Sequence, residues 1–142
     1  HAIFEKLDRA EEVFKGVLRI KSDYSAAYQN LGNIYFLKKE YGKSIEYYKS
    51  CISLNPDSAP AHISLARAYR GNRNNAKSVE HYNIAIAKSP NLREEFAYLK
   101  DNDDRDSVKA ADVAAVESHI WDEGVYSGPS AGSGDVIRDL FK

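Results

Sequence analysis

Large apolar and aromatic residues recur through the central part of the chain at spacings of three and four positions, the period of one face of an α-helix. Residues 25–58 and 59–92 carry this pattern in the same register and align without a gap. Each copy ends near a proline, at Pro56 and at Pro90, where a helix cannot continue. The pattern therefore predicts two helices in each copy and a repeat of 34 residues.

The order of residues in the first copy resembles the tetratricopeptide repeat, whose pattern is W-x2-L-G-x2-Y, then A-x3-F, then P. The matching residues are Tyr28, Leu31, Gly32, Tyr35, Ser44, Tyr48 and Pro56. The resemblance implies an all-α fold. Its architecture would be an α-solenoid of antiparallel helix hairpins that stack into a right-handed superhelix, with a concave groove lined by the first helix of each hairpin.

Each copy has a small residue where the family pattern makes two helices cross, Gly32 in the first and Ala66 in the second. A minimal side chain lets the two backbones approach closely. Tyr48 and Tyr82 are the bulky partners that fill the remaining space. We therefore expect replacement of Gly32 by leucine to unfold the repeats, because a large side chain cannot enter such a crossing.

The register extends beyond the two complete copies on both sides. Residues 1–24 resemble a partial repeat, mainly its second helix, with residues 1–4 as the remnant of the first. Because a lone helix cannot bury its apolar face, we expect the sequence to be a fragment of a longer protein. Residues 93–106 begin a partial third repeat and then change into an acidic turn.

The last third of the chain departs from the repeat pattern. Residues 107–124 are predicted to form a C-terminal capping helix, and a helix lying in or across the groove is the alternative. Residues 125–142 are predicted to be a flexible linker followed by a short amphipathic tail. The apolar residues of the tail are Val136, Ile137, Leu140 and Phe141. A docking segment and a frayed terminus are equally consistent with this composition.

The resemblance also implies which side chains face the groove. They are Gln29, Asn30, Asn33 and Phe36 in the first copy, Ile63, Ser64, Arg67 and Arg70 in the second, and Tyr98 in the third. Amides can pair with a peptide backbone and guanidinium groups with a carboxylate. We therefore expect a ligand with an acidic group near Arg67 and Arg70 and an apolar residue near Phe36 and Ile63. A merely solvated face is the alternative for each of these residues, and loss of both guanidinium groups should leave the melting temperature nearly unchanged.

Composition and spacing argue against several other functions. The formal net charge of -1 gives no reason to expect nucleic acid as a partner, and no apolar run approaches the roughly 20 residues of a membrane span. The single cysteine excludes an internal disulfide framework, and the histidines lack the spacing of a metal site. The acidic residues at 101–106 lack the glycine and the closing glutamate of a calcium loop. We therefore predict no cofactor, no metal and no catalytic residues.

These observations together predict a scaffold module for protein–protein interaction, which is not an enzyme and which binds a peptide or partner segment in the concave groove. One alternative is a regulatory or targeting appendage of an enzyme whose catalytic domain lies outside this sequence. Another is a self-associating module, in which a homo-oligomer forms or the tail docks in a groove. A cytoplasmic location is favoured, with a periplasmic one as the alternative.

Overall fold

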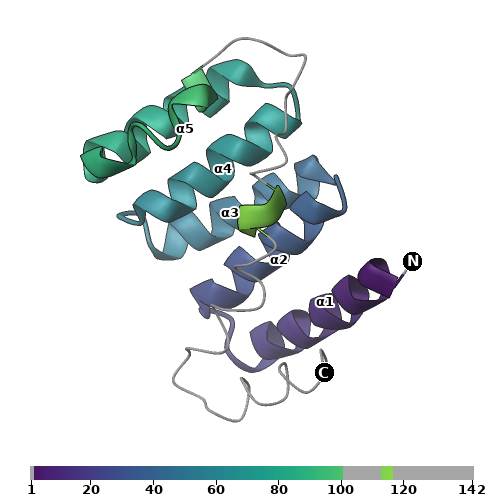
Figure 1. Cartoon of the computed structure of the whole chain (residues 1–142). Helices are drawn as coiled ribbons and strands as arrows, with labels where there is room; N and C mark the ends of the chain where they lie inside the picture. Colours follow the sequence, from purple (N-terminus) through teal and green to yellow (C-terminus); the bar gives the residue numbers. More distant parts are fainter. Residues whose placement is uncertain (1, 101–112, 117–142) are drawn as a thin grey trace.

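The computed structural model describes residues 2–100 and 113–116, and all regular secondary structure in this part of the chain is helical. Its elements are α1 (Ala2–Ile20), α2 (Ser25–Leu37), α3 (Tyr41–Leu54), α4 (Ala59–Gly71), α5 (Asn75–Lys88) and the short 3₁₀ helices η1 (Pro90–Leu92) and η2 (Ala97–Lys100), as Figure 1 shows. Residues 113–116 are also helical, and the described residues contain no strand. The all-α prediction is confirmed.

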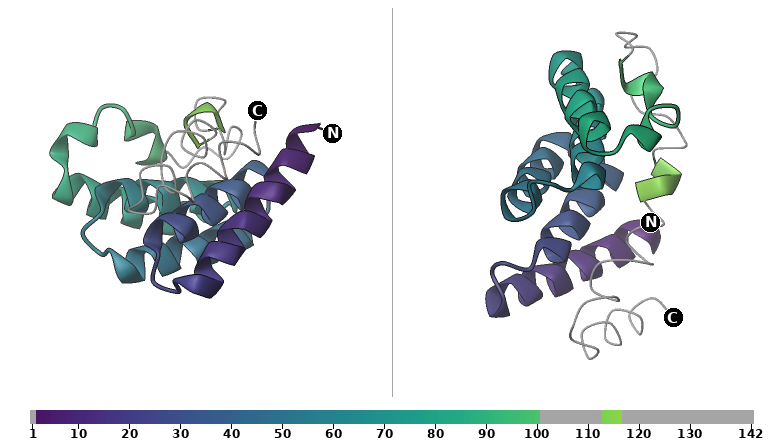
Figure 2. Two further views of the ribbon diagram at one scale, coloured as in Figure 1. Left: turned by 90° about the horizontal axis from the view of Figure 1, so that it is seen from below. Right: turned by 90° about the vertical axis from the view of Figure 1, so that its left-hand side faces the viewer.

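The helices stack in the order of the sequence. Each contacts the one before it and the one after it, so that α1 lies at one end of the row and α5 at the other (Figure 1 and Figure 2). Helices α2 and α3 form one hairpin, and α4 and α5 form the next. Short connections at residues 38–40 and 72–74 keep the two helices of each hairpin antiparallel. The prediction of an α-solenoid of helix hairpins is confirmed.

The turns inside the two hairpins have the same conformation. Lys39 and Arg73, which occupy equivalent places in the two copies, have positive φ angles of 63° and 61°. In both turns the residue that follows donates its backbone N–H to the carbonyl five residues earlier, at 2.8 Å in the first copy and 2.9 Å in the second. The repeat seen in the sequence is therefore also a repeat of backbone geometry.

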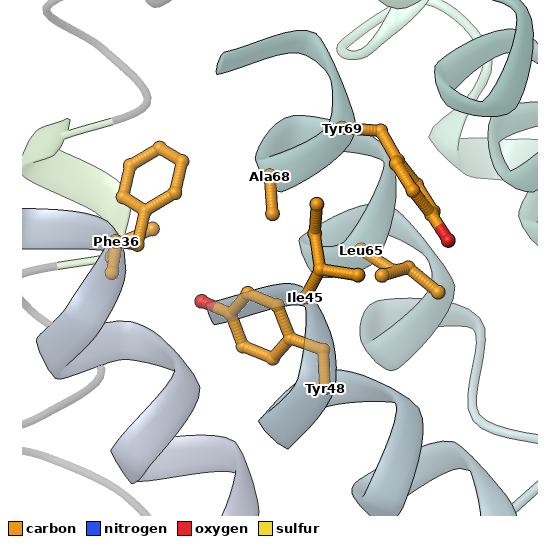
Figure 3. Close-up of a cluster of buried hydrophobic side chains, with 7 residues drawn as sticks. Phe36, Ile45, Tyr48, Leu65, Ala68 and Tyr69 are labelled. Carbon is orange, nitrogen blue, oxygen red and sulfur yellow. The ribbon is translucent and has the colours of Figure 1, made fainter. Parts of the chain in front are cut away.

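A buried cluster between the two hairpins joins them into one stack. Figure 3 shows its members converging from three helices: Phe36 from α2, Ile45 and Tyr48 from α3, and Leu65, Ala68 and Tyr69 from α4. Val116, from the short helical segment at residues 113–116, completes the cluster and is almost fully buried. A face that one hairpin could not bury alone is thus covered by its neighbour.

Helix α1 packs on the first hairpin through an apolar and a polar contact. Leu7 and Phe14 are buried against Leu31 of α2. Beside them, the carboxylate of Glu11 accepts hydrogen bonds from Lys15, Tyr35 and Lys38. Residues 2–4, which the sequence suggested as the remnant of a separate helix, belong to the continuous α1.

The segment after α5 keeps the apolar contacts expected of a third repeat without forming an α-helix. Leu99 is fully buried against Ala66 and Tyr82, but residues 90–100 form only η1, η2 and turns. The acidic turn at 101–106, most of the predicted capping helix at 107–124, and the linker and tail at 125–142 lie outside the described residues. The proposed domain boundaries there remain predictions.

Candidate functional site

A pocket of about 470 Å³ opens between α2 and α4, the first helices of the two hairpins. The end of α3 and the turn that follows it form its floor, and residues 92–96 close one side. The lining residues are Ser25, Ala26, Gln29, Asn30, Asn33, Cys51, Asn55, Ser58, Pro60, Ala61, Ile63, Ser64, Arg67, Leu92, Glu95 and Phe96.

Most of the predicted groove residues line this pocket. They are Gln29, Asn30 and Asn33 from α2, and Ile63, Ser64 and Arg67 from α4. Their spacing of three or four positions puts them on one face of each helix. Asn33 and Arg67, which occupy equivalent places in the two copies, therefore face the same space.

The structure does not bring the other three predicted residues into the pocket. Phe36 belongs to the buried cluster between the hairpins and is 2% exposed. Arg70 is also 2% exposed, and its Nη1 donates a hydrogen bond to the carbonyl oxygen of Tyr98 at 3.2 Å. The expectation that Arg67 and Arg70 are exposed charges was wrong, because α4 is covered here by Phe96 and Tyr98, whose rings lie 4.9 and 5.9 Å from the two guanidinium carbons.

Amide side chains make the polar wall of the pocket. Gln29 Nε2 donates to Ser64 Oγ at 2.9 Å and so links α2 to α4. Asn30 Nδ2 donates to the carbonyl of Ala26 at 2.8 Å, and Asn33 Oδ1 accepts from the hydroxyl of Tyr48. Burial raises the pKa of Tyr48, so its hydroxyl keeps the proton that it donates.

These contacts leave one acceptor and one donor without a hydrogen-bond partner. The acceptor is Asn30 Oδ1 and the donor is Asn33 Nδ2, which lack a partner among the described residues although their side chains are almost completely buried. They lie on successive turns of α2 and both residues line the pocket. Buried polar groups in proteins are nearly always paired, so a water, a small side-chain rotation or a polar ligand has to supply the two missing partners.

The opposite part of the pocket is mainly apolar. Ile63 is buried at its base, and Leu92 and Phe96 are half-buried in its wall. Arg67 lies with its guanidinium carbon 4.9 Å from the centre of the Phe96 ring, a distance suited to a cation–π contact. Glu95 is exposed at the rim, so the pocket carries charges of both signs.

Several residues that line the pocket were not predicted from the sequence. Ala26 and Pro60 lie three positions before Gln29 and Ile63, so the helical period could have identified them. Cys51 is buried and also lines the pocket, and burial raises the pKa of its thiol to about 11 and keeps it uncharged.

The described part of the chain offers little else that could be a functional centre. It has no group of three or more His, Cys, Asp or Glu side chains that could hold a metal ion. None of its helices is both long and apolar enough to cross a membrane.

Comparison with known proteins agrees with this architecture. A search of curated proteins gives no match. The family model of the tetratricopeptide repeat matches residues 25–58, which contain α2 and α3. Proteins with such repeats generally use them to bind other proteins, and the repeats are typically not catalytic. The segment at residues 25–58 is therefore a tetratricopeptide repeat.

Proposed function

We propose that this protein binds an extended segment of a partner polypeptide in the pocket between α2 and α4. The observation that supports this most strongly is the pair of buried atoms Asn30 Oδ1 and Asn33 Nδ2, an acceptor and a donor that lack partners among the described residues. A peptide backbone carries an N–H donor and a C=O acceptor at nearly every residue. It therefore carries both kinds of group that these atoms need, and a small rotation of the two amides would bring them to the pocket surface.

A ligand that reaches both amides gains the most binding free energy. A buried polar group left without a hydrogen bond costs about 1–3 kcal/mol. A ligand that pairs with both atoms removes that cost in addition to the contacts that it makes elsewhere. The volume of about 470 Å³ lies within the roughly 300–1,000 Å³ of typical ligand pockets.

Side-chain recognition would come from the other half of the pocket. An apolar ligand residue fits against Ile63, Leu92 and Phe96, which supply the apolar wall. An acidic ligand group is attracted towards Arg67. Arg70 and Phe36 have no part in this binding mode, because both side chains are buried and neither lines the pocket.

The same groove would serve a free scaffold and a targeting appendage of an enzyme equally well, so the chemistry of the site does not depend on that choice. Self-association through Val136, Ile137, Leu140 and Phe141 stays a prediction, because these residues lie outside the described part of the chain.

The proposal can be tested by selecting displayed peptides on the immobilised full chain and measuring the dissociation constant of a selected peptide by calorimetry. Asn30→Leu removes the buried acceptor, while the Ala26 carbonyl can keep its bond within the helix. We expect it to weaken binding at least tenfold, about 1.4 kcal/mol. The matched control is Asn83→Leu, the same change at an exposed position of α5. Unchanged affinity in Asn30→Leu, or an equal loss in Asn83→Leu, would show that the amides do not bind the peptide.

A further inference from the structure

Two histidines contact each other across the second hairpin, outside the pocket. His62 belongs to α4 and His81 to α5, and their Nδ1 atoms are 3.1 Å apart. The ring centroids are 5.3 Å apart and the ring planes are inclined by 18°. The distance between the ring centroids exceeds the distance between the Nδ1 atoms by about the sum of two imidazole ring radii. The two nitrogen atoms therefore lie between the rings and point at each other. This is the geometry of a single N–H···N hydrogen bond.

The surroundings of the pair assign the proton in that bond. His62 Nε2 lies 3.3 Å from the carbonyl oxygen of Pro56. A carbonyl only accepts, so this nitrogen carries a hydrogen and, in the neutral ring, His62 Nδ1 is the acceptor. His81 Nδ1 must then be the donor. The remaining nitrogen, His81 Nε2, lies 3.6 Å from a carboxylate oxygen of Glu80.

This arrangement can take up one proton but not two. A first proton on His81 Nε2 gives an imidazolium that faces Glu80 and still donates to His62. A second proton has one place left, His62 Nδ1. It would put two N–H groups and two positive charges face to face, and the hydrogen bond would be lost.

The other groups around the pair oppose a second charge. Burial lowers the pKa of His62 and the pKa of His81. The charge of Lys88 lowers the pKa of His62 further, against the opposite effect of the Pro56 carbonyl, and the charges of His62, Lys77 and Lys49 lower the pKa of His81. Glu80 is the one carboxylate that acts in the other direction on His81. The Tyr69 ring of α4 lies against His81, at 5.6 Å between centroids. The charged groups facing the pair are Lys49 from α3 and Lys77, Glu80 and Lys88 from α5.

We propose that His62 and His81 form a proton-sensitive contact that holds α4 against α5 while the pair carries at most one proton, and that separates when both rings are charged. The direction of the effect follows from linkage. The pKa values of both groups are lower in the folded protein than the ordinary 6.5. The stabilisation is therefore complete above that pH and is lost as the pH falls below it.

The test is urea unfolding of the full chain at about pH 7.5 and about pH 5, compared with His81→Gln. Glutamine can still donate to His62 Nδ1 but cannot be protonated. The carboxylates and His62 titrate in both proteins, so the difference between them isolates the charging of His81 beside His62. We expect acidification to reduce the folding equilibrium constant at least tenfold more in the unmodified protein than in His81→Gln. An equal reduction in both would overturn the proposal.

A second measurement does not depend on the variant folding. Long-range proton–nitrogen NMR spectra of the unmodified chain near pH 7.5 distinguish the two neutral tautomers of each histidine. The expected result is a hydrogen on Nε2 of His62 and on Nδ1 of His81. A hydrogen on Nε2 of both rings would remove the bond between them and contradict the proposal.

Discussion

The contact between Gly32 and Tyr48 makes a strong prediction about stability. A Cβ atom placed on Gly32 would lie 2.5 Å from both Cδ1 and Cε1 of the Tyr48 ring. The ring cannot move aside easily, because Tyr48 is fully buried and its hydroxyl is bonded to Asn33. Even Gly32→Ala, which adds one methyl group, must therefore push α2 and α3 apart or strain the tyrosine.

The size of the effect follows from two opposing contributions. Replacing glycine by alanine inside a helix gains up to about 1 kcal/mol of helix propensity. Overpacking of a buried contact typically costs about 1–3 kcal/mol. Gly42 of α3 provides a control, because a Cβ there meets no atom within 4 Å. Gly42→Ala shares the gain without the steric cost, so we expect it to be more stable than Gly32→Ala by about 1–3 kcal/mol.

The measurement is urea unfolding followed by far-ultraviolet circular dichroism for the two alanine variants and the unmodified chain. Native-like helical content at zero denaturant in both variants is needed for the comparison. If Gly32→Ala proves as stable as Gly42→Ala, the close crossing of α2 and α3 described above is incorrect. Gly32→Leu should be far more damaging than Gly32→Ala, in line with the expectation from the sequence.

Three further predictions concern buried polar and ionisable groups. Arg70→Ala should destabilise the protein by about 1.5–3 kcal/mol, because it removes a buried charged donor to the Tyr98 carbonyl. A decrease in the unfolding free energy of less than about 0.5 kcal/mol in urea, which is usual for exposed sites, would contradict this. Burial alone would raise the pKa of Glu11, but its three hydrogen-bond donors hold that pKa at about 2, below the ordinary 4.5. The stabilisation by the Glu11 carboxylate is thus present above about pH 4.5 and is lost as the pH falls towards 2. Glu11→Gln should therefore cost on the order of 2–3 kcal/mol near neutral pH, and its unfolding free energy should decline less steeply in acid than that of the unmodified protein. Equal declines in the two proteins would argue against this role of Glu11. The thiol of Cys51, with its pKa raised to about 11, should react with iodoacetamide at about pH 8 at least tenfold more slowly in the native protein than in urea, and similar rates would contradict its burial.

Much of the fold could be predicted from the sequence because the repeat constrains both copies in the same way. Gly32 and Ala66 fix where the helices cross, and Pro56 and Pro90 mark where each copy ends. In the second turn, Arg73 adopts the backbone conformation of its counterpart Lys39 in the first copy. Local spacing was sufficient here, since every helix packs on its neighbours in the chain.

The site was predicted less completely, because it depends on contacts that helical spacing does not contain. Phe36 has the right position for a groove residue, but Leu65 and Val116 pack in the same cluster and help to bury it. Arg70 lies one turn beyond Arg67 on the same face of α4, but its guanidinium group donates a hydrogen bond to the carbonyl of Tyr98 and does not line the pocket. That contact requires residues 97–100 to form a 3₁₀ helix, which no pattern in the sequence indicated.

The amide pair on α2 has a consequence for which partners this protein could accept. Main-chain groups are nearly the same in every polypeptide. Asn30 and Asn33 would therefore bind an extended peptide of any sequence and could not distinguish one sequence from another. Discrimination would fall to Ile63, Arg67 and Phe96, which line the pocket and would contact the side chains of a bound peptide. Partners of such a groove would share a short common signature of one apolar and one acidic residue, and could otherwise be unrelated.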